Sequence, residues 1–354
     1  LKAISAFSGC GGFSLGASAA GFELLGFIEK NEGVAKIYQE NFSNSIKLGS
    51  DIQNINLDKL ESSIELDEVD IIIGGPPCQG FSLTGKRDVN DARNFLFEDY
   101  LRLISKVRPM VFLLENVELL LTMKDPNGNL VQNRIVKDFE DVGYSVKIYR
   151  VNAQNYGVPQ NRRRVIFVGT KRNTISKLNI PNGSYSNLSN DLLEGATSSR
   201  TFADACSDLP YIENGESSNV SFHSSGSHPE HVIEWLWDVP QGKSAHDNLD
   251  PKLRPPSGYN TTYKRQLWNS PASTVQTTSG MISGSNNVHP ICTRALSIRE
   301  AARLQSFPDQ YEFTGTKGAI RTGIGNAVPP LLAFEILRNV ADALISYKNI
   351  PPED

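Results

Sequence analysis

In the first half of the chain, short apolar runs alternate with segments whose apolar residues recur at helical spacing. Strands are predicted at residues 2–7, 24–29, 69–74, 110–115, 145–151 and 165–168. Helices are predicted between them, at residues 34–42, 95–107 and 132–142. Strands that alternate with helices form mostly parallel sheets covered on both faces, with functional loops at the strand ends. We therefore expect an α/β fold of the Rossmann-like kind, whose last two strands pair as a hairpin.

After Thr170 this pattern lapses into Ser, Asn, Gly, Thr and Pro until about His289. Helical spacing returns at residues 296–305 and 329–345, and the last of these helices should pack on the sheet. The intervening stretch predicts a second lobe rich in loops. Its aromatic side chains predict a small core more than a base-stacking surface: Trp235, Trp237, Tyr259, Tyr263 and Trp268.

Composition narrows the class of protein. The 354 residues are 39% hydrophobic and 21% charged, which is ordinary for a soluble globular protein and indicates neither disorder nor a membrane span. The four cysteines form no Cys-x-x-Cys pair, which fits reduced cytoplasmic thiols better than disulfides or a zinc site. The net charge is −4, yet residues 151–190 carry six basic side chains and no acidic one. Such a segment either contacts phosphates or is a solvated basic loop.

A glycine-dense turn at residues 7–13 follows the first predicted strand. Glycines let a cofactor approach the backbone, although such turns also occur in purely structural settings. Glu29 stands at the tip of the second strand, where its carboxylate could accept hydrogen bonds from both hydroxyls of a ribose. Asp51 could accept one from an adenine amino group while Ile52 packs on the ring. Alone, the two carboxylates would be ordinary surface charges.

The run Gly75-Pro76-Pro77-Cys78-Gln79 follows a buried predicted strand. A lone cysteine is usually an inert buried residue, but rigid prolines beside a thiol at the carboxyl end of a strand favour a nucleophile. Glu115 ends the neighbouring strand, so its carboxylate should project toward the same cleft. It could donate a proton to a ring nitrogen, or it could be a charge at a helix N-terminus.

These features occur in an order that resembles the bacterial-type DNA cytosine-C5 methyltransferases, over nearly the whole chain. Six motifs carry the resemblance: residues 7–13 (the S-adenosylmethionine turn), 74–82 (the nucleophile loop), 115–117 (Glu-Asn-Val), 160–164 (Gln-x-Arg-x-Arg), 294–308 and 325–329. The resemblance implies a Rossmann-like methyltransferase sheet with a smaller, loop-rich target-recognition domain. We expect residues 1–172 and 316–354 to form the catalytic domain and residues 173–315 the recognition domain.

The resemblance also implies a cofactor and a set of site residues. The cofactor is S-adenosylmethionine, which becomes S-adenosylhomocysteine, and no metal is expected. The implied cofactor-binding residues are Phe7, Gly9, Gly11, Gly12, Glu29, Asp51, Ile52, Pro77, Leu96, Asn326 and Val328. The implied catalytic residues are Cys78, Glu115, Arg162 and Arg164. Among these, Glu115 and Arg164 would hold the target cytosine, and Arg162 would support the nucleophile loop.

The implied partner is double-stranded DNA. Candidate contacts are Ser82, Thr84 and Arg93 in the loop after the nucleophile, and Lys264, Arg265 and Thr274 in the variable lobe. Thr84 would lie near the space vacated by the flipped base, Arg93 could hold a phosphate, and the lobe could read base edges. We expect a cytoplasmic monomer with no membrane contact. It would belong to a restriction-modification or similar system, with a cognate restriction endonuclease as a functional partner.

Two other functions remain open. One is an RNA cytosine-C5 methyltransferase with the same chemistry, and the other is a catalytically inactive DNA-binding relative. The extended variable lobe favours DNA over RNA. The presence of both Cys78 and Glu115 favours an active enzyme.

Overall fold

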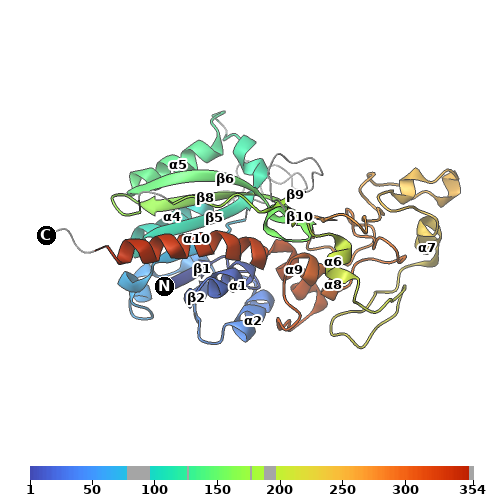
Figure 1. The fold of residues 1–354 in the computed structure, drawn as a ribbon, viewed down its shortest axis with the longest axis horizontal. Helices are drawn as coiled ribbons and strands as arrows, with labels where there is room; N and C mark the ends of the chain where they lie inside the picture. Colours follow the sequence, from blue (N-terminus) through green and yellow to red (C-terminus); the bar gives the residue numbers. More distant parts are fainter. Residues whose placement is uncertain (78–95, 126, 176–177, 187–196, 351–354) are drawn as a thin grey trace. The chain divides into compact units, whose positions relative to one another are not determined.

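The computed structural model describes residues 1–77, 96–125, 127–175, 178–186 and 197–350 (Figure 1). The chain divides into two compact units. The first comprises Leu1–Asn152, Arg163–Asn182 and Pro330–Asp354, and the second comprises Ala153–Arg162 and Gly183–Pro329. These borders reflect packing. The functional borders at 172/173 and 315/316 stay a prediction.

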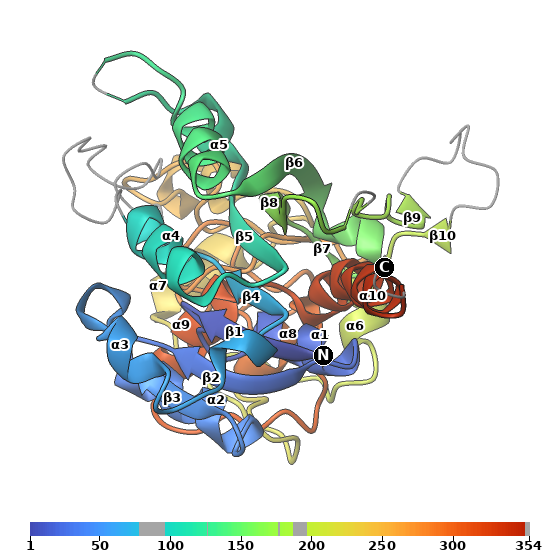
Figure 2. The same cartoon turned by 90° about the vertical axis from the view of Figure 1, so that its left-hand side faces the viewer.

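The first unit is built on a seven-stranded sheet with the order β3-β2-β1-β4-β5-β8-β6 (Figure 2). Its strands are β1 (Lys2–Ala6), β2 (Glu23–Ile28), β3 (Ile46–Gly49), β4 (Ile71–Gly74), β5 (Val111–Val117), β6 (Tyr144–Asn152) and β8 (Arg163–Lys171). Neighbours from β3 to β5 pair in parallel, whereas β8 runs antiparallel to both β5 and β6. The mostly parallel sheet, the six predicted strands and the hairpin are confirmed. β3 was not predicted because its side chains are exposed or half-buried and form no apolar run.

Helices cover both faces of this sheet. They are α1 (Gly12–Ala19), α2 (Glu32–Asn41), α3 (Leu57–Leu60), α4 (Leu96–Val107), α5 (Val131–Asp141) and α10 (Pro330–Lys348), with 3-10 turns η1 (Ile52–Asn54), η2 (Leu66–Glu68) and η5 (Glu118–Thr122). α4 and α5 pack on one face, and Figure 2 shows α1 and α10 on the other. α1 meets α10 at Gly16, where a Cβ would lie 2.4 Å from that of Ala333. The last helix therefore packs back on the first unit, as predicted.

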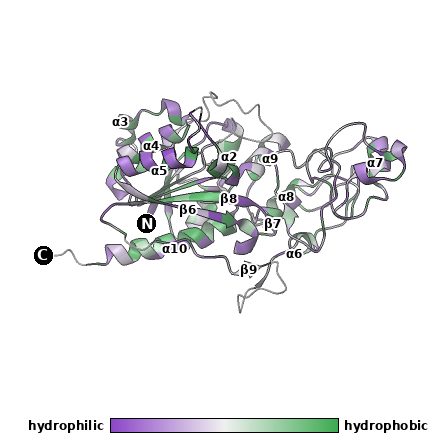
Figure 3. Ribbon diagram, turned by 90° about the horizontal axis from the view of Figure 1, so that it is seen from above, coloured by the Kyte–Doolittle hydropathy of each residue, from purple (hydrophilic) through white to green (hydrophobic). Residues whose placement is uncertain are grey.

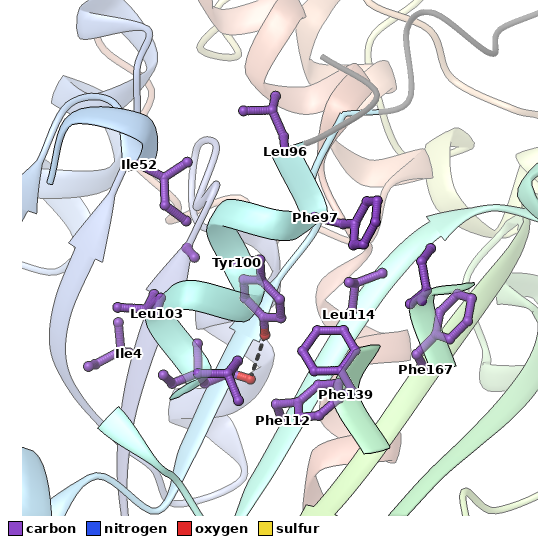
Figure 4. Close-up of a cluster of buried hydrophobic side chains, with 14 of the residues drawn as sticks. Ile4, Ile52, Leu96, Phe97, Tyr100, Leu103, Phe112, Leu114, Phe139 and Phe167 are labelled. Atoms are coloured by element: carbon purple, nitrogen blue, oxygen red, sulfur yellow. Dashed lines mark hydrogen bonds between the residues drawn. The ribbon is translucent and has the colours of Figure 1, made fainter. Parts of the chain in front are cut away.

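Tyr100 ties α4 to the two strands that lead to the predicted active site (Figure 4). Its hydroxyl lies 2.9 Å from the carbonyl oxygens of both Ile72 in β4 and Leu113 in β5. A Cβ on Gly74 would lie 2.8 Å from the Tyr100 ring, so the end of β4 requires a glycine. Because the buried hydroxyl has one proton and an acceptor on each strand, it links α4 to both strands and its hydrogen bond offsets the cost of burying it.

The second unit has little regular structure, as predicted. Its elements are η6 (Ala153–Tyr156), β7 (Gln160–Asn161), β9 (Tyr185–Ser186), β10 (Thr197–Ser198), α6 (Phe202–Cys206), α7 (Glu230–Leu236), η7 (Ala245–Asp247), η8 (Pro251–Leu253), β11 (Ala272–Ser273), α8 (Ile298–Leu304) and α9 (Lys317–Asn326). β7 pairs with β11 and β9 with β10, in parallel and over two residues each. α9 was not predicted, because its glycines at 318, 323 and 325 interrupt the helical pattern.

The small core of the second unit contains part of the predicted aromatic group. Trp235 and Tyr263 pack against the apolar cluster around α7, and their rings meet edge to face with centroids 5.6 Å apart. Trp237 and Tyr259 are instead 71% and 81% exposed. Figure 3 accordingly shows hydrophobic residues along β8 and α10, whereas α7 carries a hydrophilic face. Within the described ranges, no helix combines the length and hydropathy needed to cross a bilayer.

Candidate active site

The glycine turn after β1 has a backbone that L side chains rarely adopt. Phe7, Gly9 and Gly11 have φ values of 51°, 56° and 92°. Open space lies where a Cβ on Gly9 would project, so a ligand could approach this backbone closely. Glu29 follows β2 and braces the turn: its Oε2 accepts from the Gly9 amide at 2.9 Å and its Oε1 from Asn31 at 2.7 Å. Burial raises the pKa of Glu29, while these two amide hydrogen bonds lower it.

Asp51 follows β3 and caps η1. Its Oδ1 accepts from the Gln53 amide at 3.2 Å, and its Oδ2 lies 2.6 Å from the Lys30 ammonium. The hydrogen bond from Lys30 lowers the pKa of Asp51. Ile52 is 3% exposed and belongs to the core under α4 (Figure 4). A pocket of about 360 Å³ opens beside Asp51, and its lining includes Asn54 and Ile55. Of the predicted cofactor residues, its lining includes Asp51 but neither Glu29 nor Ile52.

The ends of β4 and β5 bring Gly75, Pro76 and Glu115 together. A Cβ on Gly75 would lie 3.2 Å from Oε2 of Glu115, so this glycine lets the carboxylate approach the loop backbone. The Asn116 side-chain amide donates to the Pro76 carbonyl at 3.0 Å. The loop that leads to the predicted nucleophile is therefore anchored beside the predicted acid. Cys78 itself lies outside the described residues.

Glu115 forms an ion pair with Arg164 across the β5 and β8 strands. The distance from Arg164 Nε to Glu115 Oε1 is 2.9 Å, and the two side chains are 14% and 11% exposed. The strand register places Arg164 opposite Val117, two residues along from Glu115 on the same face. This leaves Oε2 as the oxygen that faces Gly75. The guanidinium therefore fixes the carboxylate through Oε1, and Oε2 stays available to a polar ring.

Arg162 belongs to the second unit, and its described contacts lie there. It is 2% exposed, and it donates to the carbonyls of Val275 at 3.2 Å and Gly325 at 3.0 Å. Gln160 lies two residues earlier, fully buried, and bonds to the carbonyl of Leu304 and the side chain of Gln305. Sequence reasoning gave Gln160 and Gln305 no role. Buried amides within a motif are the signal that could have identified them. Support of the nucleophile loop by Arg162 stays a prediction.

The remaining predicted cofactor residues are distributed over both units. Gly11 is the N-cap of α1 and Gly12 its first residue. Leu96 begins α4 and is 9% exposed (Figure 4). Asn326 ends α9 in the second unit, and Val328 follows it. Pro77 is the last described residue before the nucleophile.

The six predicted DNA-contacting residues fall into three groups in the structure. Ser82, Thr84 and Arg93 lie outside the described residues. Lys264 is partly exposed, and the Thr274 hydroxyl donates to the Asn161 carbonyl at 2.9 Å. The remaining candidate, Arg265, requires a correction.

Arg265 is not a surface residue. It is 4% exposed, and its terminal nitrogens donate to four backbone carbonyls and to the hydroxyl of Thr293. Burial lowers its pKa. Because the guanidinium is buried and both of its terminal nitrogens are engaged inside its own unit, Arg265 is not among the DNA-contacting residues.

Comparisons with known proteins agree on one family. The family model described as C-5 cytosine-specific DNA methylase matches residues 1–342. The Type II methyltransferase M1.HphI of Haemophilus parahaemolyticus is 36% identical over 343 residues, which cover 96% of this chain and 86% of that protein. The Type II methyltransferase M.DdeI of Desulfomicrobium norvegicum is 32% identical over 99% of this chain and 93% of its own length.

The fold agrees as well. A solved structure of a prophage-encoded E. coli protein, described as a DNA modification methyltransferase, superposes with a TM-score of 0.75. It is 26% identical and covers 98% of this chain and 99% of its own. In the described part of the chain, no group of three or more His, Cys, Asp and Glu side chains is arranged to hold a metal ion.

Proposed function

The chain belongs to the C-5 cytosine-specific DNA methylases, and from this premise we propose how its residues divide the work. The enzyme transfers a methyl group to C5 of cytosine in DNA and uses S-adenosylmethionine. The observation that supports the assignment of roles is the Glu115–Arg164 pair, because its carboxylate lies beside Gly75, three residues before the predicted nucleophile. The match to a DNA methylase family favours DNA over the RNA alternative.

Cys78 is the proposed nucleophile. C5 of cytosine is a poor nucleophile, so the ring must first become electron-rich. The Cys78 thiolate adds to C6 while Glu115 donates a hydrogen bond or proton to N3, which gives an enamine-like intermediate that is nucleophilic at C5. When bound, S-adenosylmethionine supplies the methyl group as a sulfonium electrophile. Removal of the C5 proton by a base then expels the Cys78 thiolate and restores the aromatic ring.

Arg164 has a positioning role in this proposal. Its ion pair orients Oε1 of Glu115 and leaves Oε2 for the cytosine. Since the ring must leave the duplex stack to reach this pair, the target base is flipped out, at a cost of a few kcal/mol that pocket contacts recover. Arg162 is proposed to support the nucleophile loop, and Ser82, Thr84 and Arg93 to contact DNA near the flipped base.

The cofactor is proposed to lie over the Gly9 turn. Glu29, already fixed by two amide hydrogen bonds, accepts from the ribose hydroxyls, and Asp51 accepts from the adenine amino group. Phe7, Gly11, Gly12, Ile52, Pro77, Leu96, Asn326 and Val328 complete the proposed set. Residues 173–315, with Lys264 and Thr274 as candidates, are proposed to read the DNA sequence.

The biological setting follows from the relatives. M1.HphI and M.DdeI are Type II methyltransferases, so we propose a role in a restriction-modification system with a cognate endonuclease as a functional partner. The proposed state is a cytoplasmic monomer acting on double-stranded DNA.

One experiment tests activity and roles together. A complex DNA library is incubated with the protein and S-adenosylmethionine, and 5-methylcytosine is then mapped at single-base resolution. Methylation confined to one short sequence is expected. Cys78→Ala should abolish it while S-adenosylmethionine binding persists, and DNA containing 5-fluorocytosine should trap a covalent adduct because its C5 fluorine cannot leave as a proton. Normal turnover by Cys78→Ala would refute the mechanism, and cofactor binding with no methylation by the native chain would support an inactive relative.

A further inference from the structure

Two arginines outside the proposed machinery share one end of the β6–β8 pair. Arg150 in β6 lies opposite Val165, and Arg163 in β8 lies opposite Asn152, in a ladder without register shifts. Side chains of directly opposed residues share a face, and so do those two positions apart. Arg150 and Arg163 are therefore diagonal neighbours on one face, a placement that brings residues within about 7–8 Å.

This face is apolar where it is packed and cationic beyond. Val165 and Phe167 in β8 are buried in the core under α4 and α5, and Ile148 in β6 packs against it. Both arginines are exposed, at the end of the same rows of side chains. The face therefore changes from apolar to cationic where the two strands leave the core.

No acid of the described residues neutralises the two positive charges. Within the ranges that the structure describes, neither guanidinium forms a salt bridge or a side-chain hydrogen bond. Most other arginines are engaged, as Arg164 is with Glu115 and Arg303 is with Asp208 and Asp309. Like charges on neighbouring strand positions repel each other, so an anion between them would relieve a cost that the free protein carries.

The position of the pair identifies the anion. Arg163 directly precedes Arg164, whose guanidinium holds Glu115, so these two neighbours leave the same end of β8 on opposite faces of the sheet. Asn116, on the same face as the cationic pair because it lies opposite Val165, holds the Pro76 carbonyl of the nucleophile loop. The cationic pair therefore stands at the edge of the sheet where the cytosine must be presented, and a phosphate is the anion that accompanies every cytosine in DNA.

We propose that Arg150 and Arg163 contact backbone phosphates of the DNA strand that carries the target cytosine. This inference rests on the proposed DNA-methylating function and adds a binding surface to it. Arginine suits the role because its planar fork binds phosphate oxygens in pairs. The contacts fix the register of the duplex without reading its sequence.

The test compares two double variants with the same loss of charge. Arg150→Gln/Arg163→Gln removes the pair, and Lys171→Gln/Arg172→Gln removes two cations at the opposite end of the same hairpin. The two ends are on the order of 30 Å apart along β8. Affinity for a labelled duplex containing the mapped site is measured between about 50 and 200 mM salt, with thermal melting and S-adenosylmethionine binding as checks on folding.

Each phosphate contact contributes about 0.9 to the slope of log K against log salt. The Arg150/Arg163 variant should therefore show a slope shallower by about 1.8, so that native protein loses about tenfold more affinity than the variant across the salt range. Its KM for DNA should rise while kcat at saturating DNA is retained. The Lys171/Arg172 variant should keep the native slope, and Arg150→Lys/Arg163→Lys should restore most of it.

An unchanged slope in the Arg150/Arg163 variant would overturn the proposal, as would an equal change in the Lys171/Arg172 variant. In both cases the native protein would still methylate DNA, so the proposed function would stand. Absence of methylation by the native protein would instead refute the proposed function, independently of any salt slope.

Discussion

The two units hold their polar side chains in opposite ways. In the first, a ladder of backbone hydrogen bonds sets the register, and Glu115 and Arg164 emerge at its edge with 11% and 14% of their side chains exposed. In the second, Arg294 and Glu300 are 1% and 2% exposed and form a two-pronged ion pair at 2.7 and 2.8 Å. Charge thus lies at the proposed site of chemistry in the first unit, whereas in the second it replaces secondary structure.

Buried donors explain how a unit with two-residue strands stays ordered. Arg294 donates from Nε to the Ile212 carbonyl at 2.8 Å, and Arg265 bridges backbone carbonyls at 236, 289, 291 and 292. Each guanidinium satisfies several carbonyls that no sheet partner reaches. Substitutions of charged residues should thus stop catalysis in the first unit and disturb folding in the second.

The largest expected effect is on catalysis. Glu115→Gln removes the ionisable carboxyl group that pairs with Arg164 and is proposed to interact with N3, while the amide keeps the shape of the side chain. We expect the single-turnover rate of methyl transfer to fall by about 10³-fold, with the melting temperature and S-adenosylmethionine binding little changed. Glu118→Gln, at the start of η5, is the control with the same change of charge. Equal rates in the two variants would remove Glu115 from the mechanism.

The next effect is on folding of the second unit. Arg294→Met leaves the Glu300 carboxylate buried without its partner, so the free energy of unfolding should fall by on the order of 3 kcal/mol. Chemical denaturation measures the loss, and hydrogen exchange should show it in α8. Arg338→Met removes an exposed pair with Glu335 and should cost less than about 1 kcal/mol.

A second substitution sharpens this test. Adding Glu300→Met to Arg294→Met replaces the whole pair by apolar side chains, which should recover much of the lost stability. If Arg294→Met were as harmless as Arg338→Met, buried charge would not be what organises the second unit.

The fold of the first unit was predictable because the apolar residues of its strands and helices occur in patterns typical of each kind of element. Apolar runs predicted six of its seven strands, and strand ends share an edge, so Glu29 and Glu115 could be placed at one side of the sheet from their positions alone. β3 was not predicted because an edge strand with half-buried side chains has no such apolar run. Local pattern is therefore informative where burial is periodic.

The second unit was predictable in character and not in detail. Arg265 looks like a surface cation in sequence, and only tertiary packing shows that carbonyls enclose it. The neighbouring Lys264 has an equally polar sequence context and is partly exposed. In a segment without periodicity, nothing local distinguishes a buried arginine from an exposed one.

Acid should weaken the second unit before the pH reaches the range of ordinary carboxylates. Burial lowers the pKa of His289 to about 4, with Glu300 favouring its charge and Arg294, Arg265 and His223 opposing it. At neutral pH His289 is uncharged, so its 3.6 Å approach to Glu300 is not an ion pair. Below pH 6.5 His289 is protonated in the unfolded chain but stays neutral in the folded chain. The free energy of unfolding therefore falls until about pH 4.

The shifted pKa of His289 should lower the free energy of unfolding by ~2 kcal/mol at pH 5, which denaturation measured over a range of pH would show. A further loss of stability follows as the pH falls below 4.5, because the folded chain keeps Glu300 ionised. Burial raises the pKa of Glu300, but the hydrogen bonds from Arg294 outweigh it and lower the pKa to about 2. His289→Gln should flatten the first phase and leave the second. If the first phase persisted unchanged in that variant, another group would be its source.

The smallest expected effect is on cofactor binding, and it distinguishes the role of Asp51 from that of Lys30, its ion-pair partner at the proposed adenine site. Asp51→Ala removes an acceptor proposed for the cofactor, and calorimetry should show S-adenosylmethionine binding weakened about tenfold, the value of one hydrogen bond to a charged group. Lys30→Met removes the ammonium at 2.6 Å from the same carboxylate, but Lys30 is 76% exposed. Solvent screens such a pair, so both binding and stability should change by less than about 1 kcal/mol. A larger loss from Lys30→Met than from Asp51→Ala would mean that the ammonium, and not the carboxylate, meets the cofactor.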